Sequence, residues 1–373
     1  MNKIMYSVIG ALLILLASCT QVSRELYMFV GAYAKETESG IYLYRFNTDD
    51  GSAVLVKEVS GIVNPTFMCL SNDEKFLFSI AETAIPDAKV HAYSFDKKTA
   101  DIHLLNTQVT DGSLPVHIWV DSKNSLVATA NYASGSMSTF PLLPTGELGE
   151  VKLYTYEGGT PGSRRQNAPH LHCIFSSPDE KYLYINDLGT DRIYKYDIIS
   201  GEGGKQTLKE GQPAFFSVQA GEGPRHTTFH PKGKFAYMIS ELSGHVVVLQ
   251  YDNGNLTPIQ YIEADTLKAS ASADIHITPD GRFLYASNRM KGDGIAIFSI
   301  DQKNGQLTKI GYQPTEKNPR NFIITPDGGL LLCACQDGNV ILVFAIDKKS
   351  GQLENLQKDI NIRKPVCIKF ASL

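Results

Sequence analysis

The sequence predicts an all-β fold, a seven-bladed β-propeller with four antiparallel strands in each blade. The first observation is an internal repeat: a Pro, a short apolar segment, a turn rich in Asp, Gly and Lys, and a second apolar segment that ends at a polar residue. The copies begin at residues 65, 115, 169, 224, 272, 319 and 365, which are 46 to 55 residues apart. The second observation is that the last copy is cut short by the end of the chain. A period of this length is typical of propeller blades.

Each copy is expected to form a β-hairpin. Val, Ile, Phe and Tyr alternate with smaller or polar residues on both sides of turns such as 279–281, which reads Pro-Asp-Gly. A third strand follows each hairpin, for example at 246–251 and 294–300, and a turn such as 351–353 leads to a fourth. The fifth copy, which begins at Ser272, lacks the leading Pro.

The two chain ends are expected to share one blade. The seventh copy has room for a single strand, at 365–370, whereas residues 26–60 hold three strands with no inner strand before them. Pairing the C-terminal strand with these three closes the ring and removes the exposed edges of an open sheet. We therefore predict one propeller domain over 26–373, with six blades and unpaired ends as the alternative.

The N-terminal residues are expected to form a lipoprotein signal peptide over 1–18. The apolar run from Ile4 to Leu16 is shorter than the roughly 20 residues that span a bilayer, and it follows Lys3. Leu-Ala-Ser before Cys19 resembles a bacterial lipobox; an ordinary signal peptide is the alternative. We predict lipidation of Cys19, a tether over 19–25, and an exported protein on the bacterial cell envelope, periplasmic or on its outer face. The lipid is the only membrane contact that the sequence predicts.

Composition excludes several other functions. The net charge is −4 and the chain has no basic run, which argues against a nucleic-acid partner. The five cysteines other than Cys19 form no Cys-x-x-Cys pair and no zinc-type cluster, so we expect free thiols. No cofactor and no metal site are predicted, and the sequence does not define the oligomeric state.

The repeat also predicts where a site would lie. The start of each inner strand and the end of each second strand meet on one face of the disc, around the mouth of the central channel. The inner-strand positions are Thr66, Val116, His172, Arg225, Ala273, Arg320 and Pro365 or Val366. The second-strand positions are Glu82, Asn131, Asp187, Glu241, Asn288 with Arg289, and Gln336.

Several arginines in this ring indicate an anionic or oxygen-rich ligand, because the guanidinium fork matches carboxylate or phosphate. Ion pairs that join neighbouring blades are the alternative. His170 and His172 lie two apart on a strand, but no carboxylate at a suitable spacing supports a metal pair.

Segments at these hairpins carry a family resemblance. The segments are 29–33 (FVGAY), 130–132 (ANY), 165–172 (RQNAPHLH), 187–192 (DLGTDR), 223–226 (GPRH), 240–242 (SEL), 287–289 (SNR) and 319–322 (PRNF). In this order and spacing the sequence resembles the lactonase propeller family. That family includes propeller-type 6-phosphogluconolactonases and fungal carboxy-muconate lactonizing enzymes.

The resemblance implies a metal-independent carboxylic ester hydrolase of carbohydrate metabolism, a lactonase. Its catalytic set carries over to His172 (or His170), Glu241, Arg225 and Arg289. Substrate-binding residues are expected at His170, Asn131, Asp187 and Arg320. Glu241 or His172 would be the general base, and the arginines would hold the anionic group and the oxyanion.

The expected reaction is hydrolysis of 6-phosphoglucono-δ-lactone or a related aldonolactone to the open acid. An exported protein would not meet a cytosolic phosphorylated lactone, so the sequence leaves the substrate open. The alternatives are a non-catalytic envelope propeller that binds a ligand or protein partner, and a muconate-type cycloisomerase.

Overall fold

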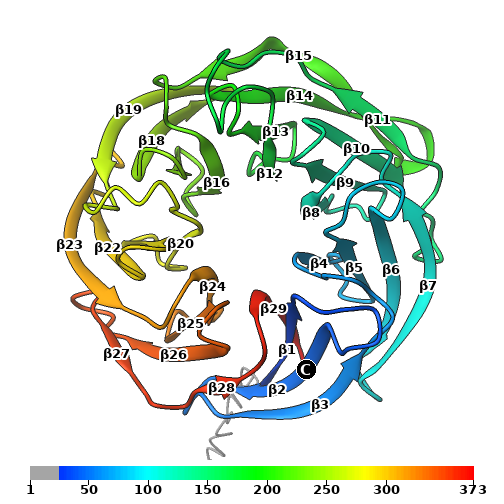
Figure 1. Ribbon diagram of the computed structural model, residues 1–373, viewed down its shortest axis with the longest axis horizontal. Coiled ribbons are helices and arrows are strands. Elements are labelled where there is room, and N and C mark those ends of the chain that lie inside the picture. The colour runs from blue at the N-terminus through cyan, green and yellow to red at the C-terminus, as the bar shows by residue number, and fades with distance from the viewer. Residues whose placement is uncertain (1–24) are drawn as a thin grey trace, which may run out of the picture.

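The computed structural model describes residues 25–373, which form a closed ring of seven antiparallel sheets around a central channel (Figure 1). The prediction of a seven-bladed propeller is confirmed. The predicted signal peptide, most of the tether and Cys19 lie outside the described residues. Within residues 25–373 no helix is long and apolar enough to cross a membrane; the single helical element there is the 3-10 turn η1 (Glu202–Gly204).

The blades are numbered from the first complete repeat, and each is given from its inner strand outward. Blade 1 comprises β4 (Met68–Leu70), β5 (Phe76–Ala81), β6 (Lys89–Asp96) and β7 (Asp101–Val109). Blade 2 comprises β8 (Pro115–Val120), β9 (Leu126–Asn131), β10 (Ser136–Pro141) and β11 (Lys152–Thr155). Blade 3 comprises β12 (Leu171–Ser176), β13 (Tyr182–Asp187), β14 (Arg192–Ser200) and β15 (Gln206–Ser217).

Blades 4 to 6 follow the same order. Blade 4 comprises β16 (Pro224–Phe229), β17 (Phe235–Ser240), β18 (His245–Asp252) and β19 (Asn255–Glu263). Blade 5 comprises β20 (Ile275–Ile277), β21 (Phe283–Asn288), β22 (Gly294–Ile300) and β23 (Leu307–Pro314). Blade 6 comprises β24 (Pro319–Ile324), β25 (Leu330–Cys335), β26 (Val340–Ile346) and β27 (Leu353–Asn355), and β28 (Ile360–Asn361) also pairs with β26.

Blade 7 closes the ring with strands from both chain ends, as predicted. Its order is β29 (Pro365–Ser372), β1 (Glu25–Ala32), β2 (Ile41–Asn47) and β3 (Ala53–Val59), so the last strand of the chain lies beside the first (Figure 1). The register runs from Leu26 opposite Ser372 to Ala32 opposite Pro365. Opening this ring would therefore break a whole strand ladder rather than a loop contact.

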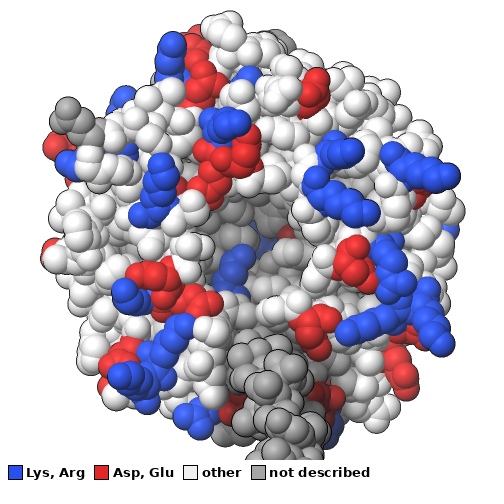
Figure 2. Space-filling model, turned by 180° about the vertical axis from the view of Figure 1, so that it is seen from behind, with Lys and Arg blue, Asp and Glu red and all other residues white. Residues whose placement is uncertain are grey.

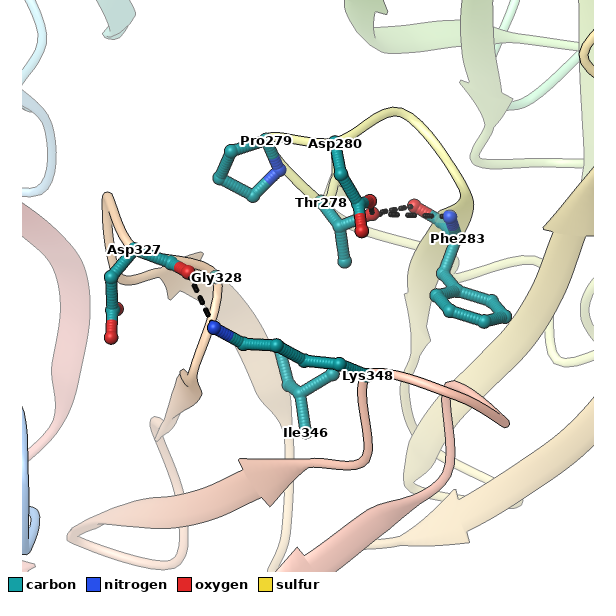
Figure 3. A pocket seen from close by; sticks show the side chains of 8 residues that line it. All are labelled: Thr278, Pro279, Asp280, Phe283, Asp327, Gly328, Ile346 and Lys348. Atoms are coloured by element: carbon teal, nitrogen blue, oxygen red, sulfur yellow. Dashed lines mark hydrogen bonds between the residues drawn. The ribbon is translucent and has the colours of Figure 1, made fainter.

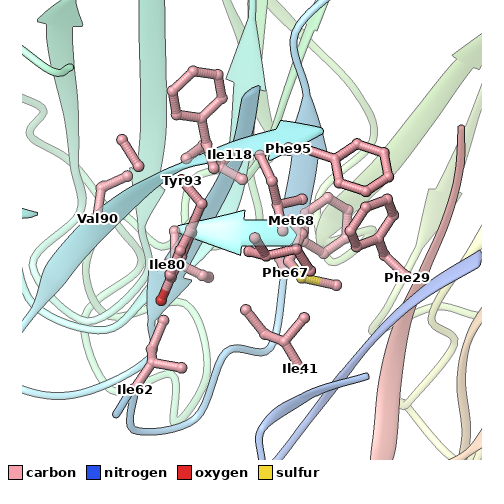
Figure 4. Close-up of a cluster of buried hydrophobic side chains, with 14 of the residues drawn as sticks. Phe29, Ile41, Ile62, Phe67, Met68, Ile80, Val90, Tyr93, Phe95 and Ile118 are labelled. Atoms are coloured by element: carbon pink, nitrogen blue, oxygen red, sulfur yellow. The ribbon is translucent and has the colours of Figure 1, made fainter. Parts of the chain in front are cut away.

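Apolar side chains fill the spaces between neighbouring blades. In one cluster, Phe29 of blade 7 meets Phe95 of blade 1 edge to face, with ring centroids 4.9 Å apart (Figure 4). Alternating strand residues supply these contacts, which is why the period-two pattern of the sequence predicts the core.

A repeated hydrogen bond also fixes the angle between blades. Three buried second-strand tyrosines reach the outer turn of the next blade, where each hydroxyl donates to a glycine carbonyl. The pairs are Tyr184 with Gly254 (3.0 Å), Tyr237 with Gly305 (2.8 Å) and Tyr285 with Gly351 (2.8 Å). These bonds join each of blades 3, 4 and 5 to the blade that follows it.

The remaining cysteines are free thiols, as expected. The face of the ring seen in Figure 2 carries charged side chains of both signs around a central hollow that contains basic groups. It has no broad basic patch of the kind that binds nucleic acid.

Candidate active site

A β-bulge occurs at the same place in five of the seven inner strands. In β8 the pairing passes from Pro115 to His117 and omits Val116. The equivalent residues omitted in the other four blades are His172, Arg225, Arg320 and Val366. Bulges redirect side chains and are common beside active sites. These five residues are positions that the repeat alignment places at the channel mouth.

The bulged residues enclose a narrow cavity at the centre of the ring. Its lining consists of Thr66, Phe67, Val116, His172, Arg225, His226, Arg320, Asn321 and Val366. Blade 5 contributes a backbone group: the Ala273 carbonyl accepts a hydrogen bond from Arg225 Nη1 (2.6 Å). The enclosed space is about 10 Å³, which is close to what a single water molecule needs. A sugar-sized ligand would therefore occupy the channel mouth and place only its reacting end here.

Glu241 organises one wall of the site. Its Oε2 accepts a hydrogen bond from Arg225 Nε (2.9 Å), and its Oε1 accepts one from Arg165 Nη2 (2.6 Å). Arg289 Nη2 lies 3.6 Å from Oε1, while Arg289 Nε donates to the Ala271 carbonyl (2.7 Å). Burial by itself raises the pKa of Glu241, but the charges of Arg289, Arg225 and Arg165 outweigh it and lower this pKa to about 2.

Glu82 organises a second wall. It accepts hydrogen bonds from the hydroxyl groups of Tyr33 (3.0 Å) and Thr66 (2.5 Å), and Arg320 Nη2 lies 3.7 Å from it. Among residues 25–373, no side chain or backbone group accepts a hydrogen bond from the Arg320 guanidinium. Its donors are therefore available to a ligand.

The two walls together favour an anion. Four arginines (Arg165, Arg225, Arg289 and Arg320) face two glutamates (Glu82 and Glu241) and the nearby Asp274 carboxylate, which leaves one positive charge in excess. Buried guanidinium groups without a matching carboxylate are costly, and a bound carboxylate, phosphate or oxyanion offsets that cost.

His172 is one of two histidines that line the cavity. Burial, followed by the positive charges of Arg225 and neighbouring groups, holds its pKa well below the usual value, so the imidazole is neutral near pH 7. Its Nδ1 is buried and has no hydrogen-bond partner within residues 25–373. A neutral imidazole with an unused nitrogen beside two guanidinium groups can accept a proton from water.

The structure brings His172, Arg225, Glu241, Arg289 and Arg320 together at the mouth, where the sequence places them. Their catalytic and binding roles stay predictions.

The other three predicted site residues neither line the cavity nor form an ion pair with its arginines. His170 stacks on Tyr132 with centroids 4.6 Å apart, and its Nδ1 lies 3.0 Å from the Tyr132 carbonyl. The fully buried side chains of Asn131 and Asp187 bond within their own blades: Asn131 Nδ2 donates to Ser138 (2.8 Å), and Asp187 Oδ1 accepts from the backbone N–H of His170 (2.7 Å). Both shape the rim rather than face the channel.

Three residues of this site were not singled out by the repeat alignment. Arg165 lies in the long connection between β11 and β12, outside the repeat, although its segment carries the family resemblance. His226 lines the cavity directly after Arg225, and Asp274 accepts its Nδ1–H (2.7 Å). Strict alternation would turn two consecutive strand residues to opposite faces of the sheet. The bulge lets both Arg225 and His226 face the cavity, so the residue pattern alone does not predict His226 there.

A larger surface pocket, of about 360 Å³, lies among the turns of blades 5 and 6 (Figure 3). It is lined by turn residues such as Asp280 and Asp327, and Lys348 Nζ donates to the Asp327 carbonyl (3.0 Å). None of the predicted site residues contributes to it. Within residues 25–373 no group of three or more His, Cys, Asp or Glu side chains is arranged to hold a metal ion; metal-independent catalysis remains a prediction.

The fold and site define a seven-bladed propeller with a neutral histidine and several arginines at its channel mouth. The chain belongs to the lactonase family of seven-bladed β-propellers, whose family model matches residues 27–370. The predicted family is thereby confirmed.

Relatives match over nearly their whole length. The chain is 38% identical to the 6-phosphogluconolactonase of Formosa agariphila, covering 89% of this chain and 96% of the relative. It is 35% identical to the 6-phosphogluconolactonase of Bacillus subtilis, covering 92% and 97%.

Solved structures show the same similarity. A Bacteroides fragilis protein superposes with a TM-score of 0.91 at 44% identity, over 95% of this chain and 99% of that one. The periplasmic gluconolactonase of Pseudomonas aeruginosa superposes with a TM-score of 0.85 at 28% identity, over 93% and 99%.

Proposed function

We propose that this protein hydrolyses a sugar lactone to the open acid, as a 6-phosphogluconolactonase or a related aldonolactonase. The observation that carries the proposal is the cavity itself, where neutral His172 adjoins Arg225 and Arg320 in a pocket with excess positive charge. The names of the Formosa, Bacillus and Pseudomonas relatives support the same substrate class.

In this reaction His172 accepts a proton from the water that attacks the lactone carbonyl carbon. The carbonyl oxygen becomes an oxyanion, which the guanidinium of Arg225 stabilises by charge-assisted hydrogen bonding. The tetrahedral intermediate then collapses, the bond from carbonyl carbon to ring oxygen breaks, and the ring oxygen takes the proton from His172. The products are a hydroxyl group and a carboxylic acid, which ionises.

Glu241 serves as an anchor in this scheme rather than as the base. Arginines hydrogen-bond both of its carboxylate oxygens, whereas Nδ1 of His172 has no partner within residues 25–373. Within the proposal, we therefore assign the base to His172.

The assay compares 6-phosphoglucono-δ-lactone with unphosphorylated aldonolactones, by pH-stat or NMR, against spontaneous hydrolysis. The variant His172→Asn should lower kcat by about 10²- to 10⁴-fold, the range for loss of a general base. His91→Asn is a matched control, because His91 is also a buried histidine with an unpartnered Nδ1, but it lies on β6 away from the cavity. A wild-type rate no faster than the spontaneous one on every lactone would refute the proposal.

We also propose that the protein is exported and anchored through a lipid on Cys19. The periplasmic location named for the Pseudomonas relative supports a family member that works outside the cytoplasm. β1 begins at Glu25 and ends beside the site, and its length of about 23 Å separates the two faces of the ring. An anchor preceding Glu25 would place the membrane on the side opposite the channel mouth, which leaves the site open to solvent.

A further inference from the structure

One loop hydrogen-bonds two arginines of the site. The segment from Ala271 to Asp274 leads into β20, and its Ala271 and Ala273 carbonyls accept hydrogen bonds from Arg289 Nε and Arg225 Nη1. This is the repeat copy that lacks the leading Pro. Its inner strand has three residues, as in β4, where β16 has six. The departure from the repeat therefore coincides with a set of contacts to the site.

Asp274 is the most highly bonded member of this loop. The carboxylate is buried, with 3% of its surface exposed. Its Oδ1 accepts hydrogen bonds from His226 Nδ1 (2.7 Å) and the backbone N–H of Ile275 (3.0 Å). Its Oδ2 accepts from His276 Nε2 (3.2 Å), the side-chain amide of Asn321 and the backbone N–H of Phe322 (3.2 Å).

These bonds fix the tautomer of His226. Burial by itself raises the pKa of Asp274, but its interactions with His276 and His226 hold it well below the usual value, so the carboxylate is ionised and accepts only. His226 Nδ1 must then carry the proton, and Nε2 presents a lone pair. That lone pair lies 3.3 Å from Arg225 Nη1, which is always a donor.

We propose that Asp274 is a positioning residue of the lactone site, which acts through His226 to fix the guanidinium of Arg225. The inference rests on the hydrolytic function proposed above. Arg225 is held by Glu241 at Nε and by Ala273 and His226 at Nη1, while its Nη2 has no partner among residues 25–373. The three fixed contacts leave that donor for the substrate, in one orientation.

The variant Asp274→Asn tests this chain of bonds directly. Three donors, from Asn321, Phe322 and His276, meet Oδ2, whereas Oδ1 receives the donors of His226 and of the Ile275 backbone. The amide oxygen of the new side chain therefore belongs at Oδ2, and its NH2 group faces His226, whose tautomer can change. His226 must then accept at Nδ1 and carry its proton on Nε2. That proton points at Arg225 Nη1, so two donors oppose each other and the guanidinium is displaced.

In the full chain, Asp274→Asn and His226→Gln should each lower kcat on the active lactone by about 10- to 100-fold, as expected for a small misplacement of a catalytic group. KM should change much less. The double variant should be no more than about threefold slower than either single variant, because both remove one connected unit. Losses that multiply would overturn the proposal.

His276→Gln is the matched control, since His276 also bonds Asp274 but does not line the cavity. Its kcat should stay within about threefold of wild type. A loss equal to that of Asp274→Asn would assign the effect to packing around the carboxylate rather than to Arg225, and would contradict the proposal.

Histidine 15N NMR separates this proposal from the proposed function. Wild type should show His226 protonated on Nδ1, and Asp274→Asn should move the proton to Nε2. If wild type hydrolyses no lactone, the function is wrong, and the tautomer alone decides the positioning role. An unchanged tautomer in a folded Asp274→Asn protein overturns it in either case.

Discussion

Replacing Glu241 with Gln tests whether a buried carboxylate organises the arginine wall. The pKa of this carboxyl falls from 4.5 to about 2 in the folded protein. At 1.36 kcal/mol per pKa unit, the ionised form gains about 3 kcal/mol from its surroundings. The neutral amide loses this charge interaction and leaves Arg225 and Arg289 repelling each other in a buried site.

The loss should depend on pH in a defined direction. A depressed folded-state pKa contributes stability that is fully present above about 4.5 and disappears as the pH falls toward 2. We therefore expect Glu241→Gln to unfold about 3 kcal/mol more easily than wild type at pH 7, or about 4 °C lower in Tm for a chain of this length. Below pH 4.5 the two unfolding curves should converge.

The same variant should lower kcat on the lactone by about 100-fold, because Arg225 loses its contact at Nε and no longer stabilises the oxyanion from a fixed position. The control is Glu222→Gln: Glu222 is also buried, but it bonds His245 (2.9 Å) and Ser243 (2.6 Å) instead of an arginine. Its kcat should stay within about threefold of wild type. An unchanged kcat in Glu241→Gln, or a stability difference that persists unchanged at pH 2 to 3, would refute this account.

Two further predictions concern the substrate and the location. Arg320→Gln should reduce kcat/KM for the phosphorylated lactone about 10- to 100-fold more than for its unphosphorylated counterpart, because the unused donors of Arg320 can supply a charge-assisted hydrogen bond to phosphate. Equal losses on both substrates would show that Arg320 does not bind the phosphate. Cys19→Ala should move the protein out of the membrane fraction, and detergent but not salt should release the wild type, because the lipid is the anchor. Unprocessed wild-type protein in the cytoplasm would contradict the lipoprotein prediction.

The fold could be predicted almost completely because a propeller repeats its sequence with its structure. Each blade uses the same turn, the same alternation and the same spacing, so weak signals add over seven copies. Ring closure was predictable for a related reason. The single strand of β29 and the three strands of β1 to β3 are each incomplete alone, and together they make one blade.

The site was predictable where it follows the repeat and hidden where it departs from it. Glu82, Asn131, Asp187 and Glu241 occupy equivalent second-strand ends, yet only the two glutamates reach the arginines. The shorter side chains bond within their own blades instead. Alignment on the turns locates the position, but side-chain length and neighbouring donors decide which way a side chain points.

The role of Asp274 could not be predicted for a different reason. Asp274 lies one residue beyond the inner-strand position of its blade and meets His226 of another blade, 48 residues earlier. Such a contact depends on the angle between blades and on the bulge at Arg225, and the residue pattern predicts neither of them.

The order of the inner-strand positions around the ring gives the cavity two unlike halves. Blades 7, 1 and 2 are adjacent and contribute Val366, Thr66 and Val116, which are uncharged. Blades 3, 4 and 6 contribute His172, Arg225 and Arg320, and blade 5 between them contributes the carbonyl of Ala273. A ligand bound here meets a proton acceptor and guanidinium groups on one side and mainly apolar surface on the other. In the proposed reaction only the ester end of the lactone enters this space, and its oxygens can accept hydrogen bonds on the polar side alone. The ester therefore meets His172 and the guanidinium groups rather than the apolar half.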